Sequence, residues 1–216
     1  MEFFKIILNL PELLSSLYAI LMIVGYIPGL IALVKFKDLT GVGKYFWFFI
    51  VITVGISFHN LIVTEANTFQ VYAVGINLAL GIVCLVIHVF KSRDYSIVIR
   101  DFSIFLVFLI LLSYLYLDKP HITQSVASVS IILAYIGQIG NYFKTKTSTG
   151  TSKWLFLIMG TGLLCLITSM VLTNTYPHII ATEVFNFILI MVCYLQANYY
   201  ERGLDNERNP EVGKNS

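Results

Sequence analysis

Long apolar runs separated by short polar connections dominate this chain. A helix needs about 20 predominantly apolar residues to cross the hydrocarbon core of a membrane. Seven runs have this character, and they cover residues 13–34, 45–64, 68–90, 97–117, 122–143, 154–173 and 178–199. The pattern therefore predicts an all-α membrane protein with seven transmembrane helices.

One stretch of the chain is written twice. Residues 26–44 align without gaps on residues 135–153, a shift of 109 positions. The identical pairs are Tyr26/Tyr135, Ile27/Ile136, Lys35/Lys144, Lys37/Lys146, Thr40/Thr149, Gly41/Gly150 and Lys44/Lys153. The same shift superposes Asn77 on Asn186 and Cys84 on Cys193. Matched Lys, Gly, Asn and Cys carry weight in so apolar a chain, so we infer an internal duplication.

The duplication divides the expected helices into two triplets. An even number of crossings separates the two copies, so both triplets point the same way and the fourth helix is a linker between them. We expect a first three-helix repeat at 1–96, linker helix four at 97–120 and a second repeat at 121–200, a 3-1-3 layout of parallel repeats. The polar residues 201–216 are expected to form a disordered cytoplasmic tail.

Composition and charge agree with a membrane protein and set its orientation. Hydrophobic residues make up 57% of the chain and charged residues only 12%, about half the share found in soluble domains. Twelve of the fourteen Lys and Arg residues lie in the first, third and fifth connections and the tail. Basic residues near helix ends stay on the cytoplasmic side. We therefore expect the N-terminus outside and the C-terminus in the cytoplasm, with the cell membrane as the location.

The repeated stretch resembles the PQ-loop motif, a Pro-Gln pair followed by a Lys-rich turn and a Gly. The first copy keeps Pro28, within Tyr26-Ile27-Pro28-Gly29, and the second keeps Gln138 after Gly137. The matching Lys, Gly and aromatic positions are Lys35, Thr40, Gly41, Trp47, Lys144, Thr149 and Gly150. With seven helices, the chain resembles the PQ-loop superfamily and, in layout, the two-repeat SWEET (MtN3/saliva-type) sugar transporters. Relatives in that superfamily also include lysosomal amino-acid exporters and the KDEL receptor.

Asn77 and Asn186 are the sharpest candidates for a binding site. They fall in the middle of expected helices at positions related by the repeat, and an amide in hydrocarbon needs hydrogen-bond partners. Two facing amides would bind the hydroxyls of a polar solute, and SWEET transporters place an Asn at this point in each triplet. The alternative is hydrogen bonding between helices alone. We expect Phe58, Asn60 and Ser169 to supply the walls of this site.

Two further groups of residues are candidates for movement and for coupling. Pro28 would kink the first helix, and the resemblance implies that it acts as a hinge; Gly137 and Gln138 stand at the corresponding place in the fifth helix. Glu183 precedes Asn186 by one turn, and a carboxylate within a span is a functional candidate. Glu183 and His59 are candidates for coupling transport to protons. The alternatives are a hydrated carboxylate near the outer surface for Glu183 and a packing role for His59.

These observations favour a membrane transporter that moves a small polar solute, most simply a sugar, by alternating access between two triple-helix bundles. The alternatives are a proton-coupled amino-acid exporter of the PQ-loop type and a receptor for a peptide signal like the KDEL receptor. The histidines are scattered in depth and no catalytic constellation converges, so we expect no enzyme, metal or cofactor. The expected partners are the solute and membrane lipids, with no nucleic acid; homo-oligomers are compatible with the sequence.

Overall fold

The computed structural model describes residues 2–64, 68–91, 119–175 and 177–208, together with residues 100, 103 and 107. These residues form six long helices and no strand. The helices are α1 (Glu2–Lys35), α2 (Phe46–Val63), α3 (Thr68–Lys91), α5 (Pro120–Thr145), α6 (Lys153–Leu172) and α7 (Pro177–Arg208). The expected linker helix at 97–120 lies almost entirely outside the described residues.

Each of the six helices is long and apolar enough to span a membrane. The apolar runs placed α2, α3, α5 and α6 to within about two residues, whereas α1 begins earlier and α7 ends later than expected. Residues 201–208 continue α7 as a helix instead of beginning a disordered tail. They include Glu, Arg and Leu, which favour helices. Residues 209–216 lie outside the described part of the chain.

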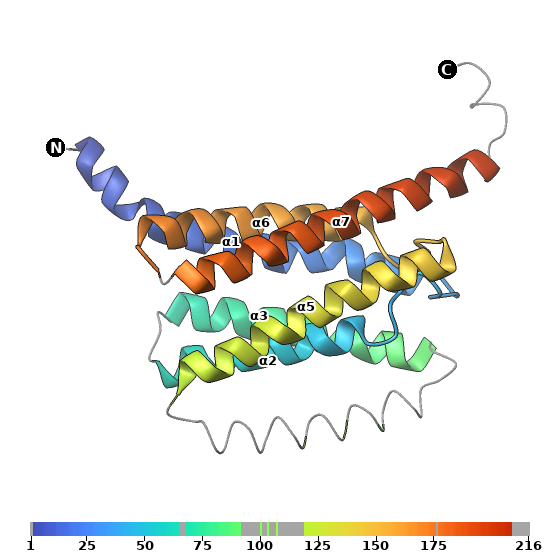
Figure 1. The fold of residues 1–216 in the computed structure, drawn as a ribbon, viewed down its shortest axis with the longest axis horizontal. Coiled ribbons are helices and arrows are strands. Elements are labelled where there is room, and N and C mark those ends of the chain that lie inside the picture. Colours follow the sequence, from blue (N-terminus) through green and yellow to red (C-terminus); the bar gives the residue numbers. More distant parts are fainter. Residues whose placement is uncertain are drawn as a thin grey trace.

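The six helices pack as a closed ring. α1 contacts α3 and α6, α2 contacts α3 and α5, and α7 contacts α5 and α6. In Figure 1, α1, α3, α5 and α7 run in one direction and α2 and α6 run back between them. Exchanging α1, α2 and α3 for α5, α6 and α7 leaves this ring of contacts unchanged. Each triplet is joined to the other through two equivalent seams, α1 with α6 and α2 with α5.

Both copies of the repeated stretch lie at one end of the bundle, which we call the inner end because the sequence predicts it to be cytoplasmic (Figure 1). The connection 36–45 touches the connection 146–152: the N–H of Gly41 donates to the carbonyl of Thr149 at 3.0 Å. A Cβ on Gly41 would lie 2.5 Å from the backbone of Ser148 and Thr149. Only glycine allows the two loops to approach so closely.

A cluster of buried aromatic side chains fills the bundle beside these loops. Phe46 is at its centre, with ring centroids 5.2 Å from Trp47, 6.2 Å from Tyr135 and 6.0 Å from Phe156. Tyr26 completes the cluster at 6.0 Å from Trp47. All five side chains are buried, and aromatic rings bury large apolar areas in such edge contacts. The cluster brings together α1, α2, α5 and α6 and closes the inner end of the bundle.

Lys91 of α3 caps the C-terminal end of α1. The last carbonyls of a helix have no partner within the helix, and the ammonium of Lys91 donates to the carbonyls of Leu33, Val34 and Phe36 at 2.6, 2.8 and 3.0 Å. A cation is favoured there because the C-terminus of a helix carries partial negative charge. This contact fixes the point where α1 ends and the loop to α2 begins.

Candidate functional site

A cavity of about 160 Å³ lies at the centre of the ring. All six described helices contribute to its walls, which we refer to as the central cavity. One water needs roughly 10–15 Å³ on a comparable measure, so there is room for several waters or a small solute. A ligand here would touch both triplets at once.

Most side chains that line the central cavity are related by the shift of 109 positions. The pairs, with both members on the wall, are Tyr18/Ala127, Met22/Ile131, Tyr26/Tyr135, Ile50/Met159, Val54/Leu163, Ser57/Leu166, Val74/Glu183 and Asn77/Asn186. The cavity therefore lies between equivalent faces of the two triplets. Its chemistry differs most at Tyr18/Ala127, at Ser57/Leu166, and at Val74/Glu183, where an alkyl group in one copy corresponds to a carboxylate in the other.

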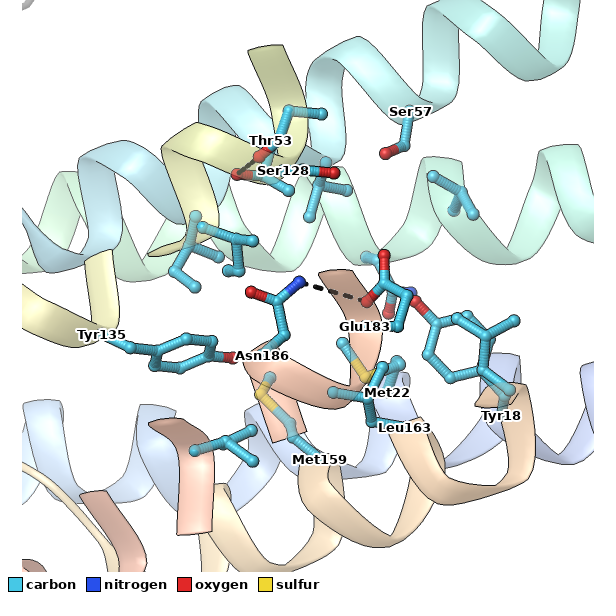
Figure 2. Close-up of a pocket in the computed structure, with 18 of the residues that line it drawn as sticks. Tyr18, Met22, Thr53, Ser57, Ser128, Tyr135, Met159, Leu163, Glu183 and Asn186 are labelled. Atoms are coloured by element: carbon cyan, nitrogen blue, oxygen red, sulfur yellow. Dashed lines mark hydrogen bonds between the residues drawn. The ribbon is translucent and has the colours of Figure 1, made fainter. Parts of the chain in front are cut away.

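The structure brings Asn77 and Asn186 into the same cavity, on α3 and α7. Both side chains are buried, at 5% and 3% exposure. The Nδ2 of Asn186 donates to Glu183 at 3.1 Å, a contact drawn in Figure 2. Within the described part of the chain, the Oδ1 atoms of both amides lack a hydrogen-bond partner. Buried polar atoms are nearly always paired in native proteins, so these two acceptors are available to a ligand.

Among the described residues, Glu183 is the one acidic side chain that lines the central cavity, and no Lys, Arg or His lines it. Its carboxylate is turned inward beside Tyr18 of α1 (Figure 2). Of its two oxygens, Oε2 receives the amide proton of Asn186. The cavity is therefore polar at α7 and carries one uncompensated carboxylate.

Several polar residues of the cavity were not expected from the sequence. Thr53, Ser57 and Ser128 present hydroxyls from α2 and α5, and Tyr18 and Tyr135 present phenol groups (Figure 2). Tyr26 also lines the cavity. Tyr26 and Tyr135 were visible as an identical pair in the duplication, which is the signal that could have placed them here. Tyr18 is replaced by Ala127 in the second copy, so the repeat gave no indication of its role.

The other predicted wall residues lie elsewhere. Phe58 is not among the residues that line the central cavity; it packs on α3, where a Cβ at Gly75 would lie 3.2 Å from its ring. Ser169 donates to the carbonyl of Pro11 at 2.8 Å and so joins α6 to α1. His59 is half-buried and lines neither the central cavity nor a second cavity that adjoins it.

Asn60 lines a second cavity of about 230 Å³, which we call the outer cavity. The Nδ2 of Asn60 donates to Gln124 at 3.2 Å, and its Oδ1 accepts from Thr123 at 2.6 Å. The outer cavity adjoins the central one, because Tyr18, Ser57, Val74, Gln124 and Leu166 line both. Hollow space thus continues from the central cavity away from the inner end.

Gln138 joins α5 to the loop between α1 and α2. Its side chain is fully buried, with 0% exposure. The Oε1 accepts from the N–H of Gly43 at 2.7 Å, and the Nε2 donates to the carbonyl of Gly41 at 2.7 Å. One turn further along α5, Asn141 donates to the carbonyl of Thr40 at 2.8 Å. Two amides of the second triplet therefore hold the loop of the first.

The two remaining hinge candidates differ in their surroundings. Pro28 stands inside α1, which continues as a helix on both sides of it. Gly137 is exposed on α5, and a Cβ there would meet no described residue within 4 Å. Its lack of a side chain is therefore not required by packing in this conformation.

Comparisons with known proteins assign no family. No family model matches the chain, and no curated protein sequence matches it. Among the described residues, no group of three His, Cys, Asp or Glu side chains is placed to hold a metal ion. The interpretation of the site therefore rests on its own geometry.

Proposed function

We propose that this chain is a membrane transporter that moves a small polar solute by alternating access between its two helix triplets. The observation that carries the proposal is the central cavity, which lies between equivalent faces of the two triplets. Two buried amides, Asn77 and Asn186, border it, and their oxygens have no hydrogen-bond partner among the described residues. Parallel repeats of this kind hold their solute near the midplane, at the interface between the repeats.

The ends of the bundle support the same proposal. Toward the inner end, the aromatic cluster and the bonds of Gln138 separate the cavity from the loops. In the other direction the central cavity continues into the outer cavity. A transporter of this type exposes its site to one side at a time, so the conformation described is closed at the inner end. The inward-open state would require the contacts around Gln138 to break, with Pro28 and Gly137 as the hinges.

The resemblance to SWEET transporters implies a sugar as the solute. A second candidate is a proton-coupled amino-acid exporter, which the carboxylate of Glu183 in the cavity favours. A receptor for a peptide carboxylate is less well supported, since no Lys or Arg lines the cavity within the described residues. The cell membrane remains our proposed location, with the inner end facing the cytoplasm.

Uptake into liposomes tests the transport proposal. Radiolabelled sugars, amino acids and amines are supplied to reconstituted wild-type protein, with and without an imposed proton gradient. The double variant Asn77→Ala/Asn186→Ala should lose most of the flux. Asn198→Ala is the matched control, because this α7 amide lies about three turns nearer the inner end and lines neither cavity.

The outcomes separate the candidates. Sugar uptake that ignores the proton gradient indicates a facilitator, and amino-acid uptake that the gradient stimulates indicates the exporter. Absence of flux for every solute would contradict the transport proposal. Flux that survives in the double variant would remove the two amides from the site.

A further inference from the structure

The charged groups of the central cavity limit the chemical classes of solute that it can bind. A carboxylate away from bulk water is costly unless a positive group or several donors accompany it. Glu183 has one described donor, the amide of Asn186 at 3.1 Å, and no basic side chain among the described lining residues. The counter-charge for this carboxylate therefore comes either from a proton or from a positive group on the ligand.

Other polar groups on the wall of the central cavity also have no described hydrogen-bond donor. The Oδ1 atoms of Asn77 and Asn186 are acceptors without a described partner, and so is the hydroxyl oxygen of Tyr26. Tyr18, Tyr26 and Tyr135 place three aromatic rings on the wall. Amide oxygens accept hydrogen bonds from an ammonium group, and aromatic faces attract cations. The carboxylate, the free acceptors and the rings are all suited to a positively charged nitrogen.

Other solute classes fit less well. A neutral sugar would satisfy the amides but would leave the carboxylate without a counter-charge. An anion would be repelled by Glu183. An amino acid would place its own carboxylate in a cavity whose described lining has no Lys, Arg or His to pair with it. A small cation without a carboxylate supplies the counter-charge for Glu183 and donors for the amide oxygens.

We propose that the central cavity binds a small organic cation, an amine or ammonium compound without a carboxylate, with its charged nitrogen against Glu183 and its remaining donors toward the oxygens of Asn77 and Asn186. The inference rests on the proposed function only in treating this cavity as the solute site. It departs from the sugar that the resemblance implies. The class is set by charge and not by size.

Four two-carbon compounds test the class, because they differ in charge and little in shape. Ethanolamine is a cation, ethylene glycol is neutral, glycolate is an anion and glycine is a zwitterion; glucose serves as the sugar. Binding of radiolabelled ethanolamine to the purified protein is measured at equilibrium, with the other compounds as competitors. The Kd of ethanolamine should be lower than that of each competitor by about tenfold or more. Flux of the same compounds is measured separately in liposomes.

Two variants locate the charge. Glu183→Gln keeps the shape of the side chain and should weaken ethanolamine binding by about 30-fold or more. Glu201→Gln is the matched control on the same helix, since Glu201 pairs with Lys153 at 3.3 Å away from the cavity. The exchange V74E/E183V moves the carboxylate to the equivalent wall position, three residues before Asn77 as Glu183 precedes Asn186. Binding should return to within about tenfold of wild type.

Each result decides a separate question. Binding of ethanolamine that Glu183→Gln removes supports the inference, and if no flux accompanies it the transport proposal fails alone. Ethylene glycol or glucose competing as strongly as ethanolamine overturns the inference, as does ethanolamine binding unchanged in Glu183→Gln or undetectable in wild type. Flux of glucose in that case leaves the transport proposal standing.

Discussion

Gly41 and Thr149 touch across the two halves of the chain, with the N–H of Gly41 3.0 Å from the carbonyl oxygen of Thr149. Each residue belongs to one copy of the duplicated stretch, on the loop that follows the first helix of its triplet. The contact joins the triplets where α1 and α5 end. It is a backbone contact, so its strength depends on how closely the two chains approach.

Gly41→Ala should disrupt this contact. The new methyl group would lie 2.5 Å from the backbone of Ser148 and Thr149, so one loop must move. We expect the free energy of unfolding to fall by about 1–3 kcal/mol, with a lower melting temperature and a more accessible inner end. Gly140→Ala is the control, because nothing lies within 4 Å of a Cβ there; alanine in that helix should be neutral or stabilising. Equal melting temperatures for Gly41→Ala and wild type would contradict the expectation.

Gln138→Ala should open the inner end. The change leaves the N–H of Gly43 and the carbonyl of Gly41 without their buried partner, at a cost of about 1–3 kcal/mol for each group. Cys193 is fully buried beside Tyr135 and serves as the reporter. In a background of Cys84→Ser and Cys165→Ser, maleimide should modify Cys193 faster once Gln138 is replaced. An unchanged rate would show that the bridge does not hold the inner end closed.

Lys91→Met should destabilise the protein through α1. Methionine keeps much of the alkyl chain and removes the ammonium that three carbonyls at the end of α1 share. The expected loss in the free energy of unfolding is about 1 kcal/mol, because the three hydrogen bonds are part-buried or exposed. Lys37→Met, at an exposed loop lysine, should change the melting temperature little. A similar effect of both variants would mean that general surface charge, and not the cap of α1, is responsible.

Phe58→Leu distinguishes the predicted wall from the observed one. Phe58 packs on Gly75 of α3 and does not line the central cavity, so its replacement should lower stability by about 1 kcal/mol and leave the solute KM unchanged. Tyr18→Leu, on the wall of the cavity, should raise KM. A raised KM in Phe58→Leu with an unchanged KM in Tyr18→Leu would place Phe58 in the site.

The sequence predicted the helices well because their signal is a simple one. An apolar run of about 20 residues crosses a membrane as a helix in most proteins. The ends of α2, α3, α5 and α6 lie within about two residues of the ends of the runs. The pairing of Asn77 with Asn186 was also accessible, because a duplication carries equivalent residues to equivalent faces. Both asparagines line the central cavity.

The rest depends on rotations and contacts that the sequence does not specify. Phe58 and Ser57 are neighbours, yet only Ser57 borders the cavity, because successive residues of a helix point about 100° apart. In helices that are apolar all round, the hydrophobic pattern does not say which side faces lipid. Gln138 was expected near a hinge, and its two bonds to the opposite loop depend on a close approach of Gly41 and Gly43 that only the packed structure reveals.

The difference between Val74 and Glu183 has a consequence for any molecule held in the cavity. A wall built from two matching halves would offer a ligand two poses of equal energy, related by a half turn. One carboxylate on α7, where the equivalent position on α3 has an alkyl group, removes that degeneracy. A polar molecule can then lie in one sense only, head toward Glu183, whichever side of the membrane it came from.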